Sequence, residues 1–237
     1  MVTAELTFSE EIEPKVQGLL QRFKNAAPEQ ILKWTIEEFG SEIALATGFG
    51  AEGCVLIDMI SKLDRSARIF YLDTDFFFPE TYALLERLEL RYSISFERRA
   101  TSLSPEAQAS QYGDRLWERH PDECCRLRKV EPLIEALAGL RAWITGIRRD
   151  QSPARATAAV VERDRKFHLI KINPLVGWSS IEVWKYIVKH DVPYNPLHDK
   201  GFPSIGCTHC TTPVRAGEDP RAGRWRERPK TECGLHK

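Results

Sequence analysis

The chain has 237 residues, of which 42% are hydrophobic, and its 34 basic and 34 acidic side chains cancel to a formal net charge of zero. This composition excludes a disordered or fibrous chain and argues against a general nucleic-acid binder. The N-terminal sequence lacks the basic and apolar segments of a signal peptide, and no stretch has the ~20 apolar residues of a membrane span, so we expect a cytoplasmic protein with no membrane partner.

The spacing of apolar residues predicts helices that alternate with strands. Two amphipathic helices are expected first, over Glu10–Lys24 and Pro28–Phe39. The other expected elements are, in chain order, a strand at Ile43–Ala46, a helix at Cys54–Leu63, a strand at Arg68–Leu72, a helix at Pro79–Leu90, a strand at Tyr92–Phe96, a helix at Cys124–Leu140, a strand at Ala142–Thr145, a hairpin of Val160–Val161 with His168–Ile172, and a helix at Ser179–His190.

This alternation predicts an α/β fold, with a parallel twisted sheet flanked by helices. We expect residues 1–206 to form a nucleotide-binding α/β domain that begins with the helices of residues 1–40. Residues 207–237 are rich in Pro, Gly, Arg and Cys and show no long apolar period. They are expected to form a loop-rich tail organised by a ligand.

A glycine-rich turn, Thr47–Gly53, lies between the first predicted strand and the helix that follows it. Such a turn lets backbone N–H groups approach a phosphate at the helix N-terminus. The spacing matches the dinucleotide-binding pattern, but a tight turn without a ligand has the same spacing. No Gly-Lys-Ser/Thr sequence occurs, which argues against a P-loop nucleoside triphosphatase.

Four of the six cysteines form two close pairs, Cys124-Cys125 and Cys207-x-x-Cys210. Four thiolates can bind one metal centre when the two segments meet. The second pair alone is compatible with zinc, redox or iron–sulfur chemistry. Adjacent cysteines fit poorly around a single zinc ion, whereas a larger cluster accommodates them better.

The other two cysteines differ in setting. Cys233 lies close to the C-terminus, where a cysteine can move between a buried substrate and an external redox partner. His236 or an arginine near it can lower its pKa, and the thiolate is the reactive form. Cys54 is expected to be a small core residue. A pocket for a multiply charged anion is suggested by a group of basic residues. The group comprises Arg215, Arg221, Arg224, Arg226, Arg228 and Lys230, together with Arg126, Arg128 and Lys129 and with Arg148-Arg149.

Eight motifs, taken together and in this order, resemble the assimilatory adenylylsulfate and phosphoadenylylsulfate reductases. The resemblance covers the chain from about residue 40 to its C-terminus. The motifs are Thr47-Gly-Phe-Gly-Ala-Glu, Leu72-Asp-Thr, Cys124-Cys-x-x-x-Lys129-Val-x-Pro132-Leu, Thr145-Gly-Ile-Arg-Arg-Asp-Gln-Ser152, Asn173-Pro-Leu, Cys207-x-x-Cys210, Arg221-Ala-Gly-Arg-Trp225 and Glu232-Cys-Gly-Leu-His236.

The resemblance implies an adenine nucleotide α-hydrolase-like fold with a modified PP-loop. It favours the branch that uses adenylylsulfate (APS), because that branch carries one [4Fe-4S] cluster, here on Cys124, Cys125, Cys207 and Cys210. Cys233 would be the catalytic nucleophile. The substrate contacts implied by position are Thr47, Gly48, Gly50, Glu52, Asp73, Thr74, Lys129, Arg148, Arg149, Arg221 and Arg224.

Two motifs depart from the family pattern. In the glycine loop, Gly48 and Phe49 replace polar residues and Gly53 replaces an acid. The usual Asp-Thr-Gly-Arg has become Asp73-Thr74-Asp75-Phe76, with the loss of a basic residue.

The reaction that the resemblance implies is reduction of APS to sulfite and AMP in assimilatory sulfate reduction, for cysteine biosynthesis. An S-sulfocysteine forms on Cys233, and thioredoxin or glutaredoxin supplies the electrons. The 3′-phosphorylated substrate (PAPS) is a further candidate substrate, and a homo-oligomer is compatible with the family.

Two rival interpretations remain. An adenylating ATP pyrophosphatase of the same fold needs a Ser-Gly-Gly-x-Asp-Ser loop, which the sequence lacks. A non-catalytic zinc or iron–sulfur module that binds a nucleic acid or a protein would leave the glycine loop and Cys233 unexplained.

Overall fold

The structure is a computed structural model that describes residues 13–226, 228, 230 and 232–235. The predicted helix at Glu10–Lys24 therefore lies partly outside the described residues, and residues 13–22 are helical. The chain forms two compact units. The first unit consists of Met1–Thr47, Ala51–Ile69 and Gly139–Val192, and the second of Gly48–Gly50, Phe70–Ala138 and Pro193–Lys237. The expected domain boundary at residue 206 stays a prediction.

The first unit contains strands β1 (Ile43–Thr47), β4 (Ala142–Ile144), β6 (Leu169–Ile172) and β5 (Val161–Asp164), which pair in that order. The first three are parallel, with Leu45 opposite Ile144 and Ile144 opposite Ile172. Apart from Thr47 and Lys171, these three strands consist of Ile, Leu, Ala and Trp and are mostly buried, as expected for strands that are covered on both faces. Strand β5 runs antiparallel to β6, which confirms the predicted hairpin.

Three helices of the first unit match their sequence signals. Helix α2 (Pro28–Phe39) begins with a proline at its first position and ends at Gly40, which has a positive φ. Helix α9 (Ser180–His190) begins after Ser179, whose hydroxyl accepts from the backbone N–H of Glu182. Helix α3 (Ala51–Leu63) follows the glycine loop and is buried over most of its length.

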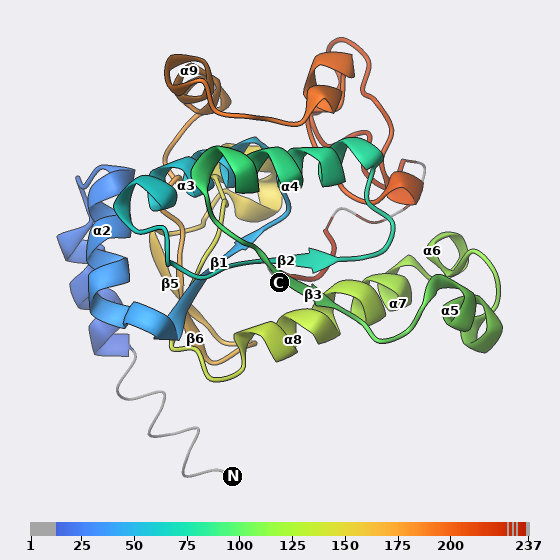
Figure 1. Ribbon diagram of the computed structural model, residues 1–237, viewed down its shortest axis with the longest axis horizontal. Coiled ribbons are helices and arrows are strands. Elements are labelled where there is room, and N and C mark those ends of the chain that lie inside the picture. Colours follow the sequence, from blue (N-terminus) through green and yellow to red (C-terminus); the bar gives the residue numbers. More distant parts are fainter. Residues whose placement is uncertain (1–12, 227, 229, 231, 236–237) are drawn as a thin grey trace. The chain divides into compact units, whose positions relative to one another are not determined.

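The second unit contains strand β2 (Ile69–Asp73), apart from its first residue, which belongs to the first unit, and the parallel strand β3 (Glu97–Ala100). In Figure 1, helix α4 (Pro79–Tyr92) lies on one side of these two strands and helix α8 (Glu131–Leu137) on the other. The remaining helices are α5 (Pro105–Tyr112), α6 (Leu116–Arg119) and α7 (Pro121–Cys125), together with a π-helical turn at Arg126–Val130.

Mostly parallel strands flanked by helices confirm the predicted fold class, but one predicted strand was misplaced, one predicted helix has other bounds, and two helices were not predicted. The strand expected at Tyr92–Phe96 is β3 instead, because α4 continues to Tyr92 and Ser93 ends it with a left-handed backbone. The helix expected at Cys124–Leu140 begins at Pro121, passes through the π turn and ends at Leu137. Helices α5 and α6 were not predicted.

The C-terminal part of the second unit is loop-rich, as predicted. It contains short 3-10 turns at Pro196–Lys200 and Thr208–Cys210 and a single-residue bridge between Thr211 and Arg224. The first unit has further 3-10 turns at Gly40–Glu42, Arg149–Gln151 and Pro153–Arg155. Among the described residues, no helix has both the length and the apolar character that crossing a bilayer requires.

Candidate active site

The glycine loop after β1 has an unexpected backbone conformation. Its positive φ, 57°, belongs to Phe49 and not to a glycine. A bulky residue rarely adopts this region, so the surroundings must stabilise it. The Phe49 side chain is buried, and its ring packs 5.3 Å from Phe96 and 5.4 Å from Tyr71. The aromatic residue that departs from the family pattern therefore anchors the loop in the second unit, beside the predicted phosphate contacts Gly48 and Gly50.

The start of α3 and the segment after β4 meet within the first unit. The Arg148 Nε donates to Glu52 Oε1 across 2.8 Å, and the same guanidinium contacts Asp150 and the Trp178 carbonyl. Arg149 instead donates from Nε to the Ala158 carbonyl. The structure thus brings Glu52 and Arg148 together and holds both side chains in place. A role of either arginine in binding substrate stays a prediction.

Gly53 leaves space for the side chain of Thr47, another predicted substrate contact of the first unit. A Cβ atom at Gly53 would lie 2.6 Å from the Thr47 Oγ1, which is too close for two non-bonded atoms. The glycine that replaces the family's acid therefore allows the Thr47 hydroxyl to approach the first turn of α3.

The end of β2 carries a charged network in the second unit. Asp73 accepts hydrogen bonds from the Tyr82 hydroxyl, at 2.8 Å, and from Arg98 Nε, at 2.7 Å. Asp75, which has a φ of 58°, accepts from Arg98 and also from Arg128. Thr74 is buried, and its Oγ1 lies 3.3 Å from the Cys207 Sγ. The altered Asp73–Phe76 sequence is therefore tied directly to the cysteines.

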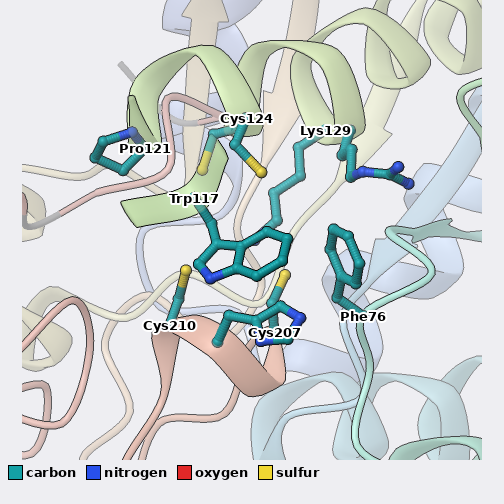
Figure 2. Close-up of a pocket in the computed structure, with 10 residues that line it drawn as sticks. Phe76, Trp117, Pro121, Cys124, Lys129, Cys207 and Cys210 are labelled. Carbon is teal, nitrogen blue, oxygen red and sulfur yellow. The ribbon is translucent and has the colours of Figure 1, made fainter. Parts of the chain in front are cut away.

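The two cysteine pairs line one pocket of the second unit. In Figure 2, Cys124 on the upper helix faces Cys207 and Cys210 on the lower turn, and the Lys129 side chain extends from the upper helix toward the space between them. Cys124, Cys125 and Cys207 are buried, and Cys210 is partly exposed. The fold thus brings all four predicted ligands together, although the pairs lie far apart in the sequence.

Burial and mutual repulsion disfavour thiolates in this pocket when no metal is present. Burial, followed by the charges of the other three cysteines, raises the pKa of Cys124 to about 12. Burial also raises the pKa of Cys125 and of Cys210. Burial alone would lower the pKa of Lys129, but the sulfurs of Cys207, Cys233 and Cys125 raise it, so this lysine stays a cation. The four sulfurs therefore need a cationic partner to be thiolates together.

Cys233 has the opposite electrostatic balance. Burial would raise the pKa of its thiol, but Lys129, the Leu235 backbone and Arg224 outweigh burial and lower it. A cysteine that is partly exposed and has a lowered pKa fits a nucleophile. His236, which was expected to take part in this effect, lies outside the described residues.

The two predicted tail arginines lie near each other. Arg221 and Arg224 both contact the Ser204 hydroxyl, and Arg221 also pairs with the buried Glu232 across 3.3 Å. A Cβ atom at Gly206 would lie 2.4 Å from Arg224 Nη2, so this glycine lets the guanidinium approach the backbone beside Cys207. Most of the other basic side chains of the predicted anion pocket are already paired: Arg126 with Glu123 and Glu131, Arg128 with Asp75, Arg226 with Glu218, and Lys230 with Asp122.

The donor set fits a metal centre with sulfur ligands. Four thiols line one pocket beside a lysine, and thiolates bind iron–sulfur clusters or zinc. Two buried N–H donors in the C-terminal part of the second unit, Arg224 Nε and Trp225 Nε1, have no hydrogen-bond partner within the described part of the chain. Among the described residues, no three His, Cys, Asp or Glu side chains are arranged around a single ion.

Several side chains of the pocket were missed by sequence reasoning. They are Phe76, Trp117 and His209, whose rings form aromatic walls. His209 had a signal, because it stands between Cys207 and Cys210 in the sequence. Trp117 had none, because it reaches the pocket from a helix that was not predicted.

Comparison with known proteins identifies one family over most of the chain. The family described as "Phosphoadenosine phosphosulfate reductase domain" matches residues 42–213. An adenosine 5'-phosphosulfate reductase of Halalkalibacterium halodurans is 53% identical over 87% of this chain and 90% of its own length. A phosphoadenosine 5'-phosphosulfate reductase of Gloeobacter violaceus is 48% identical over 93% of each chain. The crystal structure of a phosphoadenylyl-sulfate reductase from Candida auris in a phosphate complex is 33% identical, with a TM-score of 0.76 over 84% of this chain and 97% of that one.

Proposed function

Because the chain belongs to the phosphoadenosine phosphosulfate reductase domain family, we propose that it reduces adenosine 5'-phosphosulfate (APS) to sulfite and AMP. The observation that carries the proposal is the position of Cys233. The positive charges of Lys129 and Arg224 act on its thiol and contribute to its lowered pKa. The relative from Halalkalibacterium halodurans, named for this substrate, covers most of the chain and supports the assignment.

The first chemical step follows from the Cys233 thiolate. It attacks the sulfur atom of APS, a sulfur–sulfur bond forms, and the bond between sulfur and the phosphate oxygen breaks. AMP leaves with the bonding electron pair, and Cys233 carries a sulfonate as S-sulfocysteine. Lys129 and Arg224 are cations that can stabilise the negative charge on the transferring oxygens. Thr47, Glu52, Arg148 and Arg149 stay predicted substrate contacts.

The second step needs a dithiol as reductant. One thiolate of thioredoxin or glutaredoxin attacks the Cys233 sulfur, and sulfite leaves with the electron pair of the sulfur–sulfur bond. The partner's second thiol then attacks the mixed disulfide, completes a disulfide on the partner and releases Cys233. The overall reaction converts APS and a dithiol into AMP, sulfite, a disulfide and two protons. A reducing cytoplasm is the compartment that keeps such a partner and Cys233 reduced.

The four pocket cysteines, Cys124, Cys125, Cys207 and Cys210, are proposed to hold one [4Fe-4S] cluster. Bound there, the cluster would supply a fixed charge and a rigid link between the two cysteine segments. Both electrons of the reaction come from the dithiol, so the proposal needs no electron transfer through this site. Anaerobically purified protein should therefore absorb broadly in the blue, whereas a zinc protein would be colourless.

The test compares APS with its 3′-phosphorylated form, PAPS, because a relative named for PAPS is also similar over most of the chain. Sulfite release is followed with reduced thioredoxin and each substrate in turn. The proposal expects a higher kcat/KM for APS. Release from PAPS alone would transfer the assignment to that substrate, and no release from either would overturn it.

A further inference from the structure

The wall of the thiol pocket that carries His209 is its most exposed part. Cys124, Cys125 and Cys207 are all less than 9% exposed, whereas Cys210 is partly exposed and its neighbour His209 is exposed. The side chain of His209 lines the same pocket as the four thiols. Solvent therefore meets the pocket at His209, beside the partly exposed Cys210.

Three aromatic rings are packed together at this wall. Trp117 and His209 stack face to face, with ring centroids 3.9 Å apart and planes 9° apart. Phe76 meets both rings edge-on, at 5.2 Å from Trp117 and 4.9 Å from His209. In the view of Figure 2, the indole ring of Trp117 lies across the space between Cys124 and the lower cysteines. The stack is close enough to exclude water from between the rings.

Each ring is fixed to a segment that carries or contacts a cysteine. Trp117 packs against the buried cluster of Leu116, Cys124 and Leu127, and its carbonyl accepts from Arg228. His209 belongs to the Thr208–Cys210 turn, and the Thr208 backbone N–H donates to the Phe76 carbonyl across 2.8 Å. The three rings are thus held where they are by the same contacts that position the thiols.

We propose that Trp117 and His209 form an aromatic cover that restricts the access of oxidants and electrophiles from solvent to the four pocket thiols. The two stacked rings present apolar surface at this wall of the pocket, and separating them exposes that surface to water. The cover has no role in the proposed reaction itself. Its biological use rests on the proposed cluster, since clusters with thiolate ligands are lost when an oxidant reaches them.

The first experiment measures thiol access in the full-length protein after reduction and removal of any bound metal. Iodoacetamide is the probe: a thiolate attacks its methylene carbon, a carbon–sulfur bond forms, and iodide leaves. Mass spectrometry of peptides gives the alkylation rate of each cysteine. Trp117→Ala and His209→Ala should raise the rates of Cys124, Cys207 and Cys210 by about tenfold, the order of effect expected for losing one stacked pair.

Two controls separate a cover from a general loss of structure. Cys54 is 0% exposed on α3, outside this pocket, and should keep its rate in every variant. His190→Ala removes a histidine that lies 4.1 Å from the Tyr186 ring and does not line the pocket, so it should change nothing. His209→Phe retains a stacking ring and should restore the slow rates. Unchanged rates in both alanine variants, or equal acceleration of Cys54, would overturn the proposal.

A second experiment addresses the protein as purified. If iron is present, the visible absorption of Trp117→Ala should bleach in air about tenfold faster than that of the unaltered protein, because the same stacked pair is lost. If no iron is present, the proposed cofactor fails, and the alkylation rates still decide whether the cover exists.

Discussion

Arg128 donates a hydrogen bond from Nη1 to Asp75 Oδ2 across 2.7 Å, and its side chain is only 1% exposed. The same guanidinium reaches the carbonyls of Thr74 and Leu103 and the side chain of Gln108. It therefore links the end of β2 to the π turn that follows the first cysteine pair. A buried cation with this many partners is costly to remove, because each partner is left without its hydrogen bond.

Replacing Arg128 by Met should lower the free energy of unfolding by about 3 kcal/mol, since Gln108 and two carbonyls lose their donor. Arg128→Lys should recover little, because an ammonium group cannot reproduce the fork of a guanidinium. Urea denaturation measures both. Arg126→Met is the matched control: Arg126 is an exposed ion-pair partner, and its loss should cost much less than the loss of Arg128. Equal effects at the two positions would contradict the structural role of Arg128.

Cys233→Ser should abolish sulfite release while leaving iron content and visible absorption unchanged, because Cys233 is not among the four thiols that line the pocket. In the unaltered protein, APS without any dithiol should add one sulfonate group to the Cys233 peptide, which mass spectrometry detects. Cys54→Ala serves as the control and should behave like the unaltered protein. Sulfite production by Cys233→Ser would show that another residue is the nucleophile.

Lys129→Met should move the rising limb of the kcat/KM pH profile to higher pH. Only the Cys233 thiolate attacks, so activity increases as the pH rises through the pKa of Cys233. Burial raises this pKa and Lys129 lowers it, so removal of Lys129 raises it. For each unit of upward shift, activity below the pKa should fall about tenfold.

Lys129→Arg keeps the positive charge and should keep the pH profile. Lys185→Met, an exposed position on α9, controls for a change in net charge. If Lys129→Met lowers kcat/KM equally at every pH, the lysine acts on the substrate and not through the pKa of Cys233.

The Glu52–Arg148 pair should show energetic coupling in a double-mutant cycle. Arg148 is 6% exposed and donates to Glu52 across 2.8 Å, so replacing Glu52 removes one acceptor of a buried cation, and replacing Arg148 removes the donor to a partly buried carboxylate. We expect Glu52→Gln and Arg148→Met to be coupled by roughly 1–2 kcal/mol in the free energy of unfolding. Additive effects would mean that Asp150 and the Trp178 carbonyl are sufficient to hold Arg148.

Elements with strong local signals were predictable from the sequence. Helix α2 matched its predicted bounds, Pro28–Phe39, because a proline begins it and Gly40 ends it. Strand β3 was missed because Glu97-Arg98-Arg99-Ala100 has no apolar alternation, and a strand that pairs with β2 alone tolerates charge. The π turn was missed because the spacing of apolar residues does not reveal a change in the hydrogen-bond register of a helix.

The same distinction applies to the site. The cysteine pairs were predictable because thiols at such spacings have few structural uses, and the pocket does bring them together. The Trp117–His209 stack and the ties of Arg128 were not, because they join residues that are distant in the sequence through tertiary packing alone.

The two cysteine pairs come from segments far apart in the chain, and this separation has a thermodynamic consequence. A group held by all four thiols is also a reversible cross-link, which closes a long loop in the unfolded chain. By analogy with a disulfide across a comparable loop, such a link contributes roughly 4 kcal/mol to stability. Loss of the bound group and loss of folded structure are then coupled equilibria. The time for which the protein stays folded therefore depends on how well the four pocket thiols are protected.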